Sequence, residues 1–332
     1  MTAGTKTAPI VTIFGGSGFV GRYIARRMAK RGWRVRVAVR RPNEAIFVRP
    51  YGDVGQVEPI QANIRDEVST RSAIEGATAV INCVGILYQD SRQKFHRVQG
   101  EGAERIARLA AECGAKTLVH ISAIGADADS LSDYASSKAE GEAAVLEHFP
   151  DATILRPSII FGPEDQFFNR FAAMAKLAPI VPMVGADTRF QPVYVDDVAE
   201  AACKGAVGEA TGLYELGGPE IFTFRELMEI MLTEIRRKRL LVAVPFGIAK
   251  IMAAVLDGVQ TVTLGIIANR QITRDQVRLL AGDNVVAEGA KGFTDLGIEP
   301  TTVESVVGEY LYAYRPYGQY DAITESAANL KS

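Results

Sequence analysis

Glycines near the start of the chain have the spacing of a phosphate-binding turn. Gly15, Gly18 and Gly21 follow the apolar run 10–14, and a helical pattern begins at Phe19. The first two let the main chain approach a pyrophosphate closely, and the helix start offers free N–H groups and a positive dipole end. Gly21 would let the helix pack close to the strand. We therefore expect a dinucleotide at Gly15, Ser17, Gly18, Phe19, Val20 and Gly21.

Two arginines, Arg40 and Arg41, follow the predicted strand 33–39. A site selective for NAD normally carries an acidic residue here, which binds the ribose 2′-hydroxyl, whereas a guanidinium pairs with a 2′-phosphate. One or two charge-assisted contacts of about 1.5–3 kcal/mol each favour NADPH over NADH by roughly tens to thousands of fold. We therefore expect NADPH (NADP⁺) as the cofactor; the alternative is that both arginines simply face solvent.

The ends of the third and fourth predicted strands carry further candidate contacts. Asn63 can hydrogen-bond the edge of the adenine ring while Ile64 packs on its face. Cys83, Val84 and Gly85 follow the fourth strand, and Gly85 would let the chain pass close to the ribose of the cofactor.

Tyr134 and Lys138 have the spacing of an acid–base pair. Positions four apart share one face of a helix, so the lysine lies one turn from the tyrosine. Its charge lowers the pKa of the phenol, and its amine can bind the nicotinamide ribose. The pair predicts a proton donor or acceptor beside a hydride site. An ordinary exposed tyrosine and lysine on a surface helix are the alternative.

The elements that would position these residues alternate between strand and helix. We expect strands at 10–14, 33–39, 57–61, 79–83, 117–122 and 153–155, with helices at 19–30, 94–113 and 134–148. This alternation predicts an α/β fold of the Rossmann type, a doubly wound parallel sheet. We assign 1–160 to this domain, with 190–210 returning to it. Residues 161–189 and 211–320 form a smaller mixed α/β lobe, and 321–332 a loose tail.

Composition excludes several classes of protein. The formal net charge is −2, which argues against nucleic-acid binding. The three cysteines show no CxxC spacing and the three histidines are isolated, so we expect neither a disulfide framework nor a metal site. The first strand starts near Pro9, which leaves little room for a targeting segment, and no apolar run suits a bilayer span. We expect a bacterial cytoplasmic protein.

Together these features resemble the extended and atypical short-chain dehydrogenase/reductase family, from Ile10 to about Leu216. The stretches LRPSIIFGP (155–163) and QPVYVDDVA (191–199) also match that family. The resemblance implies that the first of these stretches lines the nicotinamide end of the cofactor. The residues that would lie at that end are Ile121, Ser122, Pro157, Ser158 and Ile159.

The chain departs from the family at two catalytic positions. The family's serine or threonine after the fifth strand corresponds to Ala123, with Ser122 one residue early and therefore directed elsewhere. Its asparagine corresponds to about Gln99. Loss of the donor that polarises a substrate carbonyl would cost on the order of 10²–10³ in rate, while cofactor binding would survive.

Within that family the chain is similar to the NADPH-binding accessory subunits of respiratory complex I. The stretch RPSIIFGPEDQFFNRF (156–171) and the Tyr134/Lys138 pair without its serine carry this similarity. It implies a non-catalytic subunit on the peripheral arm near the membrane, with other complex I subunits as partners, on the cytoplasmic side of a bacterial inner membrane. The alternatives are a soluble NADPH-dependent reductase or nucleotide-sugar epimerase, and a module that senses the NADPH/NADP⁺ ratio.

Two segments of the second half could contact a partner. Four basic residues, 236–239, precede the apolar stretch 240–256, which Pro245 and Lys250 interrupt. We interpret residues 246–256 as packed inside the smaller lobe; the alternative is an apolar helix that lies on a bilayer or a partner. A second apolar stretch covers 260–267. The segment EYLYAYRPY (309–317) is rich in tyrosine and either folds back on its own domain or binds a partner.

Overall fold

The structure, a computed structural model, describes residues 8–89, 93–262 and 273–318, with 255–262 as backbone alone. The chain divides into two compact units. Unit 1 consists of 1–157, 195–216 and 288–298. Unit 2 consists of 158–194, 217–287 and 299–332.

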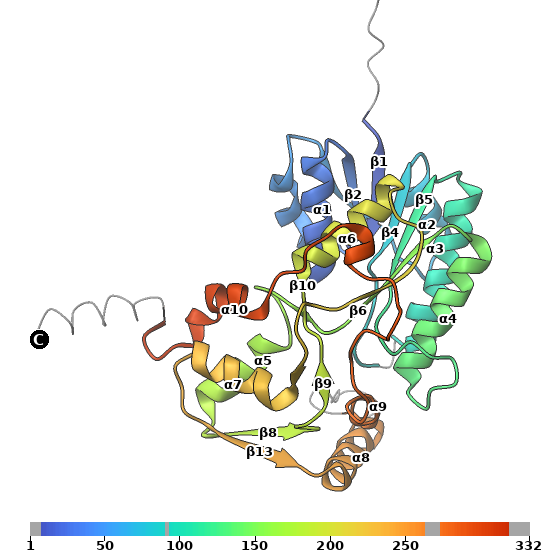
Figure 1. The fold of residues 1–332 in the computed structure, drawn as a ribbon. Coiled ribbons are helices and arrows are strands. Elements are labelled where there is room, and N and C mark those ends of the chain that lie inside the picture. Colours follow the sequence, from blue (N-terminus) through green and yellow to red (C-terminus); the bar gives the residue numbers. More distant parts are fainter. Residues whose placement is uncertain (1–7, 90–92, 263–272, 319–332) are drawn as a thin grey trace, which may run out of the picture. The chain divides into compact units, whose positions relative to one another are not determined.

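A parallel sheet forms the centre of unit 1 (Figure 1). Among the described residues it has seven strands, in the order β11-β6-β5-β4-β1-β2-β3, and every neighbouring pair is parallel. The strands are β1 (Ile10–Phe14), β2 (Arg34–Val39), β3 (Val57–Gln61), β4 (Ala79–Asn82), β5 (Thr117–Ile121), β6 (Thr153–Pro157) and β11 (Gly212–Leu216). The expected doubly wound α/β class is confirmed, and β11, which our division of the chain places in the smaller lobe, belongs to this sheet.

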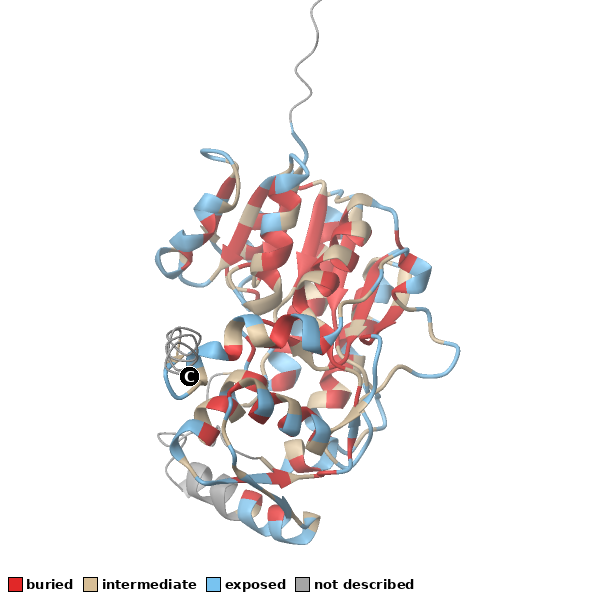
Figure 2. Ribbon diagram, turned by 60° about the vertical axis from the view of Figure 1, so that its left-hand side comes forward, coloured by how far each residue is buried: buried red, intermediate tan, exposed pale blue. Residues whose placement is uncertain are grey.

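Helices cover both faces of this sheet. Phe14, Val80 and Leu118 pack against α2, α3 and α4 in one buried cluster. On the opposite face α1 and α6 contact each other, and Gly205 of α6 lies close to Val119 of β5. Figure 2 shows the strands buried between these two layers. The helical elements of unit 1 are α1 (Phe19–Lys30), η1 (Pro42–Tyr51), α2 (Glu67–Ile74), η2 (His96–Gly100), α3 (Glu101–Glu112), α4 (Asp133–His148), α6 (Val195–Val207) and η3 (Thr294–Leu296).

An ion-pair network fixes the helix that follows the glycine turn. Arg27 of α1 binds both carboxylate oxygens of Asp196 on α6, at 2.7 and 2.8 Å. Glu200, one turn along α6, pairs with Arg27 and with Arg31. These side chains are about one-third exposed or less, so the bidentate geometry is screened less than a fully exposed pair. The network therefore holds the last turn of α1 against α6.

Unit 2 is built from helices and short strand pairs. Its two-stranded sheets are β10-β7, β12-β9 and β13-β8. Aromatic residues and methionines form its core, among them Phe168, Phe224 and Met231. The elements are β7 (Ile160–Phe161), α5 (Phe168–Leu177), β8 (Ile180–Val184), β9 (Arg189–Phe190), β10 (Val193–Tyr194), β12 (Phe222–Thr223), α7 (Phe224–Glu234), β13 (Leu240–Val244), α8 (Phe246–Val262), α9 (Arg274–Leu279), α10 (Val303–Leu311) and η4 (Tyr312–Tyr314).

The apolar stretch 240–256 is not one helix. Residues Leu240–Val244 form β13, which pairs in parallel with β8, and Pro245 separates the strand from α8. Proline cannot supply the N–H of a continuing helix, so it divides the stretch. The preceding helix α7 ends at Glu234, before the four basic residues 236–239. Most of the second apolar stretch, 260–267, lies outside the described residues.

Two tyrosines of the C-terminal segment fold back within unit 2. The Tyr310 hydroxyl donates to Asp165 Oδ2 at 2.7 Å, and the Tyr314 hydroxyl donates to Asn169 Oδ1 at 3.0 Å. Tyr312 and Tyr317 are exposed by 41% and 62%. The segment therefore packs on its own unit through alternate tyrosines and leaves two others at the surface.

Candidate functional site

The glycine turn joins β1 to α1 at the carboxyl end of the sheet. Gly15 has φ +74°, and its N–H donates to Ala38 O at 3.1 Å, so the turn crosses beside β2. A Cβ at Gly15 would lie 3.2 Å from the main-chain carbonyl of Cys83. A Cβ at Gly21 would lie only 2.4 Å from Gly15 O. Both positions therefore require glycine, one for its dihedral angle and both for close packing.

The start of α1 is open to an anion. Gly18 is its N-cap, no side chain caps it, and the first turn holds no acidic residue. The free N–H groups of a helix start and its positive dipole end favour a phosphate group there. The predicted positions Ser17, Gly18, Phe19 and Val20 all lie at this junction and are exposed or half-buried. The geometry of the turn fits the pyrophosphate of a dinucleotide.

Arg40 and Arg41 lie directly after β2 and are both exposed. Arg40 donates to Gln93 Oε1 at 3.2 Å, and Arg41 pairs with Glu44 Oε1 at 2.9 Å. Glu44 lies in the first turn of η1, so part of the positive charge at this strand end is already compensated. The sequence pattern alone did not identify this carboxylate.

Asn63 and Ile64 have different environments. Asn63 is half-buried, and its Oδ1 accepts a hydrogen bond from Arg65 N at 3.2 Å. Ile64 is only 9% exposed, belongs to the core cluster beside α3, and packs over Gly102. Little of the Ile64 side chain is left to contact a base, which departs from the sequence-based expectation.

Two side chains that our prediction left out shape the turn after β4. Asn82 is 2% exposed; its Oδ1 accepts from Val84 N at 3.0 Å, and its Nδ2 lies 3.1 Å from His120 Nδ1. Since Oδ1 accepts, Nδ2 donates, so Nδ1 of His120 is the acceptor and the imidazole is neutral. Burial lowers the pKa of His120 to about 3. This pair fixes the turn of Cys83, Val84 and Gly85.

Tyr134 and Lys138 lie one turn apart on α4, which begins after the N-cap Ser132. The Lys138 amine donates to Ile121 O at 3.2 Å and lies 5.9 Å from the centre of the Tyr134 ring. The same ring packs edge-on against Phe95, with 5.7 Å between centroids. Burial lowers the pKa of Lys138 to about 8, against an opposing effect of Glu142.

Lys138 also borders the turn after β4. A Cβ at Gly85 would lie 3.5 Å from the Lys138 amine. The structure therefore brings together the ends of β4 and β5 and the face of α4 that carries the acid–base pair.

The positions of the missing catalytic groups are occupied differently. Ser122 is 4% exposed, and within the described chain its Oγ has no hydrogen-bond partner. Gln99 lies in η2, a π-helical turn; its Nε2 donates to Ile86 O at 3.1 Å. The main-chain oxygen of Gln99 would lie 2.2 Å from a Cβ added at Gly141, so α4 packs closely on this turn. The expected helix 94–113 is thus divided into η2 and α3.

The stretch after β6 divides between the two units. Pro157 ends β6 in unit 1, where it pairs with Leu216. Ser158 and Ile159 belong to unit 2. The Ser158 hydroxyl lies 2.7 Å from Asn284 Oδ1, and Ile159 packs against the core of that unit. The predicted place of these residues at the nicotinamide end therefore stays a prediction.

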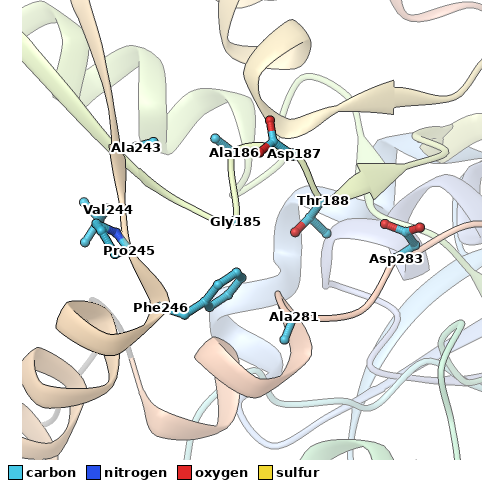
Figure 3. Close-up of a pocket in the computed structure, with 10 residues that line it drawn as sticks. All are labelled: Gly185, Ala186, Asp187, Thr188, Ala243, Val244, Pro245, Phe246, Ala281 and Asp283. Carbon is cyan, nitrogen blue, oxygen red and sulfur yellow. The ribbon is translucent and has the colours of Figure 1, made fainter.

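Unit 2 contains a pocket of about 410 Å³ between β8, β13, α8 and α9 (Figure 3). The ring of Phe246 faces the turn at Gly185. The Thr188 hydroxyl donates to Leu280 O at 2.6 Å, and Asp283 binds Arg189. Thr188 and Asp283 therefore hold the loops that line the pocket. Over the described residues there is also no group of three or more potential metal ligands.

Comparison with known proteins agrees with this geometry. Residues 11–206, more than half of the chain, match the NAD dependent epimerase/dehydratase family. The chain belongs to that family. A nicotinamide dinucleotide is therefore the cofactor that the family and the glycine turn both support. The fold is also similar to a triphenylmethane reductase from Citrobacter, at 18% identity and a TM-score of 0.69, over 91% of this chain and 99% of that one.

Named relatives within the family extend over both units. The chain is 36% identical to "NADH dehydrogenase [ubiquinone] 1 alpha subcomplex subunit 9, mitochondrial" of Arabidopsis thaliana, over 93% of this chain and 79% of the relative. It is 33% identical to the "NADH-ubiquinone oxidoreductase 40 kDa subunit, mitochondrial" of Neurospora crassa, over 93% and 80%. It is 31% identical to a ceramide reductase of Caulobacter vibrioides, over 68% and 70%.

The first two relatives are mitochondrial proteins of eukaryotes. This finding contradicts the expected location on the cytoplasmic side of a bacterial inner membrane. That expectation depended on the short lead-in before Pro9, which carries no information on the compartment, and it is wrong.

Proposed function

We propose that this chain is an NADPH-binding accessory subunit of respiratory complex I, with a structural role and without turnover of its cofactor. The observation that carries the proposal is similarity to two named complex I subunits over 93% of the chain, which includes both units. The ceramide reductase, in comparison, is similar over 68%. Other complex I subunits would then be the partners.

The cofactor site supports the NADPH part of the proposal. No acidic residue occupies the end of β2, where Arg40 and Arg41 are exposed and could approach a 2′-phosphate. Gly15 and Gly21 provide the close turn for the pyrophosphate. The bound dinucleotide would supply hydride chemistry in an enzyme; here its binding free energy would instead stabilise the folded chain.

The substrate side supports the absence of turnover. Ala123 has no hydroxyl to polarise a carbonyl, and Ser122 is buried. The Lys138 amine is engaged by Ile121 O. The chain would retain the groups that hold the nicotinamide ribose and lack the donor that a carbonyl substrate needs.

A surface of unit 2 supports peripheral contact with a membrane. Ile180, Leu240 and Val242 are exposed on one side of the β8–β13 pair, and Ile248, Ile251 and Met252 are exposed along α8. Exposed lysines lie nearby in sequence, at 176, 238 and 250. Apolar side chains with basic neighbours suit an anionic lipid surface. Along the described chain, no helix has the length and apolar character needed to cross a bilayer.

The cofactor content of the purified protein tests this function. We expect about one NADPH per chain, released on denaturation and unchanged after incubation with carbonyl compounds or nucleotide sugars. Oxidation of NADPH with such a substrate at about 1 s⁻¹ or faster, an ordinary enzyme rate, would contradict the proposal.

A soluble NADPH-dependent reductase or nucleotide-sugar epimerase is the second candidate. The observation in its favour is the Tyr134/Lys138 pair. The two side chains lie close together on one face of α4, and the pKa of Lys138 is lowered to about 8. In that case Tyr134→Phe abolishes activity while the cofactor stays bound. Activity that is unchanged in Tyr134→Phe would exclude this mechanism.

A further inference from the structure

Two arginines on successive turns of α1 stack on two aromatic rings of η1. The Arg22 guanidinium lies 5.0 Å from the centre of the Phe47 ring, and the Arg26 guanidinium lies 4.8 Å from that of Tyr51. All four residues belong to unit 1. Since η1 buries only Ala45 and Val48, these stacked pairs add to its packing on α1.

Arg22 has a second set of contacts within the glycine turn. Its Nε donates to Gly18 O and its Nη2 donates to Ser17 O, both at 3.2 Å. The N–H of Arg22 also donates to Gly18 O, at 3.1 Å. The Arg26 guanidinium instead stacks on the rings of Tyr23 and Tyr51 and not on the glycine turn. One guanidinium thus binds the carbonyl side of the turn that would receive the pyrophosphate.

We propose that Arg22 is a positioning residue that holds the pyrophosphate-binding turn and the β2–β3 crossover in one arrangement. This inference rests on the proposed dinucleotide binding. The fork of the guanidinium fixes the Ser17 and Gly18 carbonyls, which leaves the N–H groups at the start of α1 free for the anion.

Its stack on Phe47 also sets the position of η1, which begins directly after Arg40 and Arg41. The turn is common to NADPH and NADH, so Arg22 supports the binding of both. Arg40 and Arg41, in contrast, would strengthen the binding of NADPH alone, because only NADPH carries a 2′-phosphate.

Binding of NADPH and of NADH to Arg22→Gln tests this role, with Arg26→Gln as the matched control. We expect Arg22→Gln to raise both dissociation constants about tenfold and to leave their ratio unchanged, since two hydrogen bonds to the turn are weakened. Arg22→Lys keeps the charge but cannot bond both carbonyls, so it does not rescue binding. Arg26→Gln stays within about twofold of the unaltered protein because it leaves the turn intact.

Three outcomes would overturn the inference. They are unchanged affinities in Arg22→Gln, an equal loss in Arg26→Gln, or a loss restricted to NADPH, which would mean that Arg22 contacts the 2′-phosphate itself. If Arg22→Gln does not fold, Arg22→Lys, which keeps a cation beside Phe47 but cannot bond both carbonyls, must weaken both cofactors for the inference to stand. An unaltered protein that binds neither dinucleotide would contradict the proposed function as well.

Discussion

The Lys138 amine donates a hydrogen bond to the main-chain oxygen of Ile121 at 3.2 Å. Lys138 is 5% exposed, and Ile121 is the last residue of β5, at the carboxyl edge of the sheet. The bond places a buried cation beside the turn after β4 and next to the Tyr134 ring. A buried charged amine needs hydrogen-bond acceptors. A ribose hydroxyl of the cofactor would be a second acceptor for the Lys138 amine, beside the Ile121 carbonyl.

The burial of Lys138 predicts a rise in stability in alkaline solution. Its pKa is about 8 in the folded chain, below the ordinary lysine value of 10.5 that applies once the chain unfolds. Between these values the unfolded chain binds more protons at this amine, so the contribution of Lys138 to the free energy of unfolding of the cofactor-free protein increases with pH. Lys138→Met removes this increase, which denaturation curves from about pH 7.5 to 10.5 would measure, with the exposed Lys30→Met as control. The same slope in Lys138→Met and the unaltered protein would refute the assignment.

The arginines after β2 predict cofactor preference. Arg40→Ala should raise the dissociation constant of NADPH about tenfold or more and leave that of NADH unchanged, because one charge-assisted contact is lost. Arg41→Ala should have a smaller effect, since Glu44 already pairs with Arg41. Glu44→Gln should then tighten NADPH binding. Titration calorimetry checks these values, with the exposed Arg49→Ala as control; equal losses for both dinucleotides in Arg40→Ala would count against the 2′-phosphate assignment.

The Tyr310–Asp165 bond predicts a stability effect in unit 2. Asp165 is 4% exposed, burial raises the pKa of its carboxyl group, and the Tyr310 hydroxyl is one of its donors. Tyr310→Phe should lower the free energy of unfolding by about 1.5–3 kcal/mol, the range for a hydrogen bond to a charged group. Thermal melts should show this loss, whereas Tyr312→Phe, at an exposed position, should melt like the unaltered protein. Equal melts for both variants would show that the bond contributes little.

The exposed apolar residues of α8 predict binding to lipid. Ile251→Glu should reduce sedimentation of the protein with vesicles of about 30% anionic phospholipid. Val54→Glu, at a fully exposed position of unit 1, is the matched control because it adds the same charge elsewhere. A loss of binding in both variants would indicate a general charge effect, and full binding by Ile251→Glu would exclude this surface.

Local sequence determined the elements that begin and end at clear signals. β1, α1 and β3 have the predicted bounds, since apolar runs and turn glycines define them. The glycine turn follows the expected path for the same reason. The strand β13 within the stretch 240–256 was not predicted, because a continuous apolar run has no period that separates strand from helix.

Other features depend on contacts between distant residues. The π-helical turn η2 packs under Gly141, about forty residues away, and no local pattern signals it. Asn82 meets His120 only because β4 and β5 are neighbours in the sheet. The position of Arg22 directly after Gly21 is visible in the sequence. Its stack on Phe47 could not be predicted, because that contact depends on where η1 packs.

Isolation of the tagged chain from gently solubilised membranes of its native cells tests the central claim most directly. We predict that complex I subunits copurify with it in equal amounts, together with about one bound NADPH per tagged chain. Recovery of the chain alone, while complex I is intact in the same extract, would contradict the account and favour the reductase or epimerase.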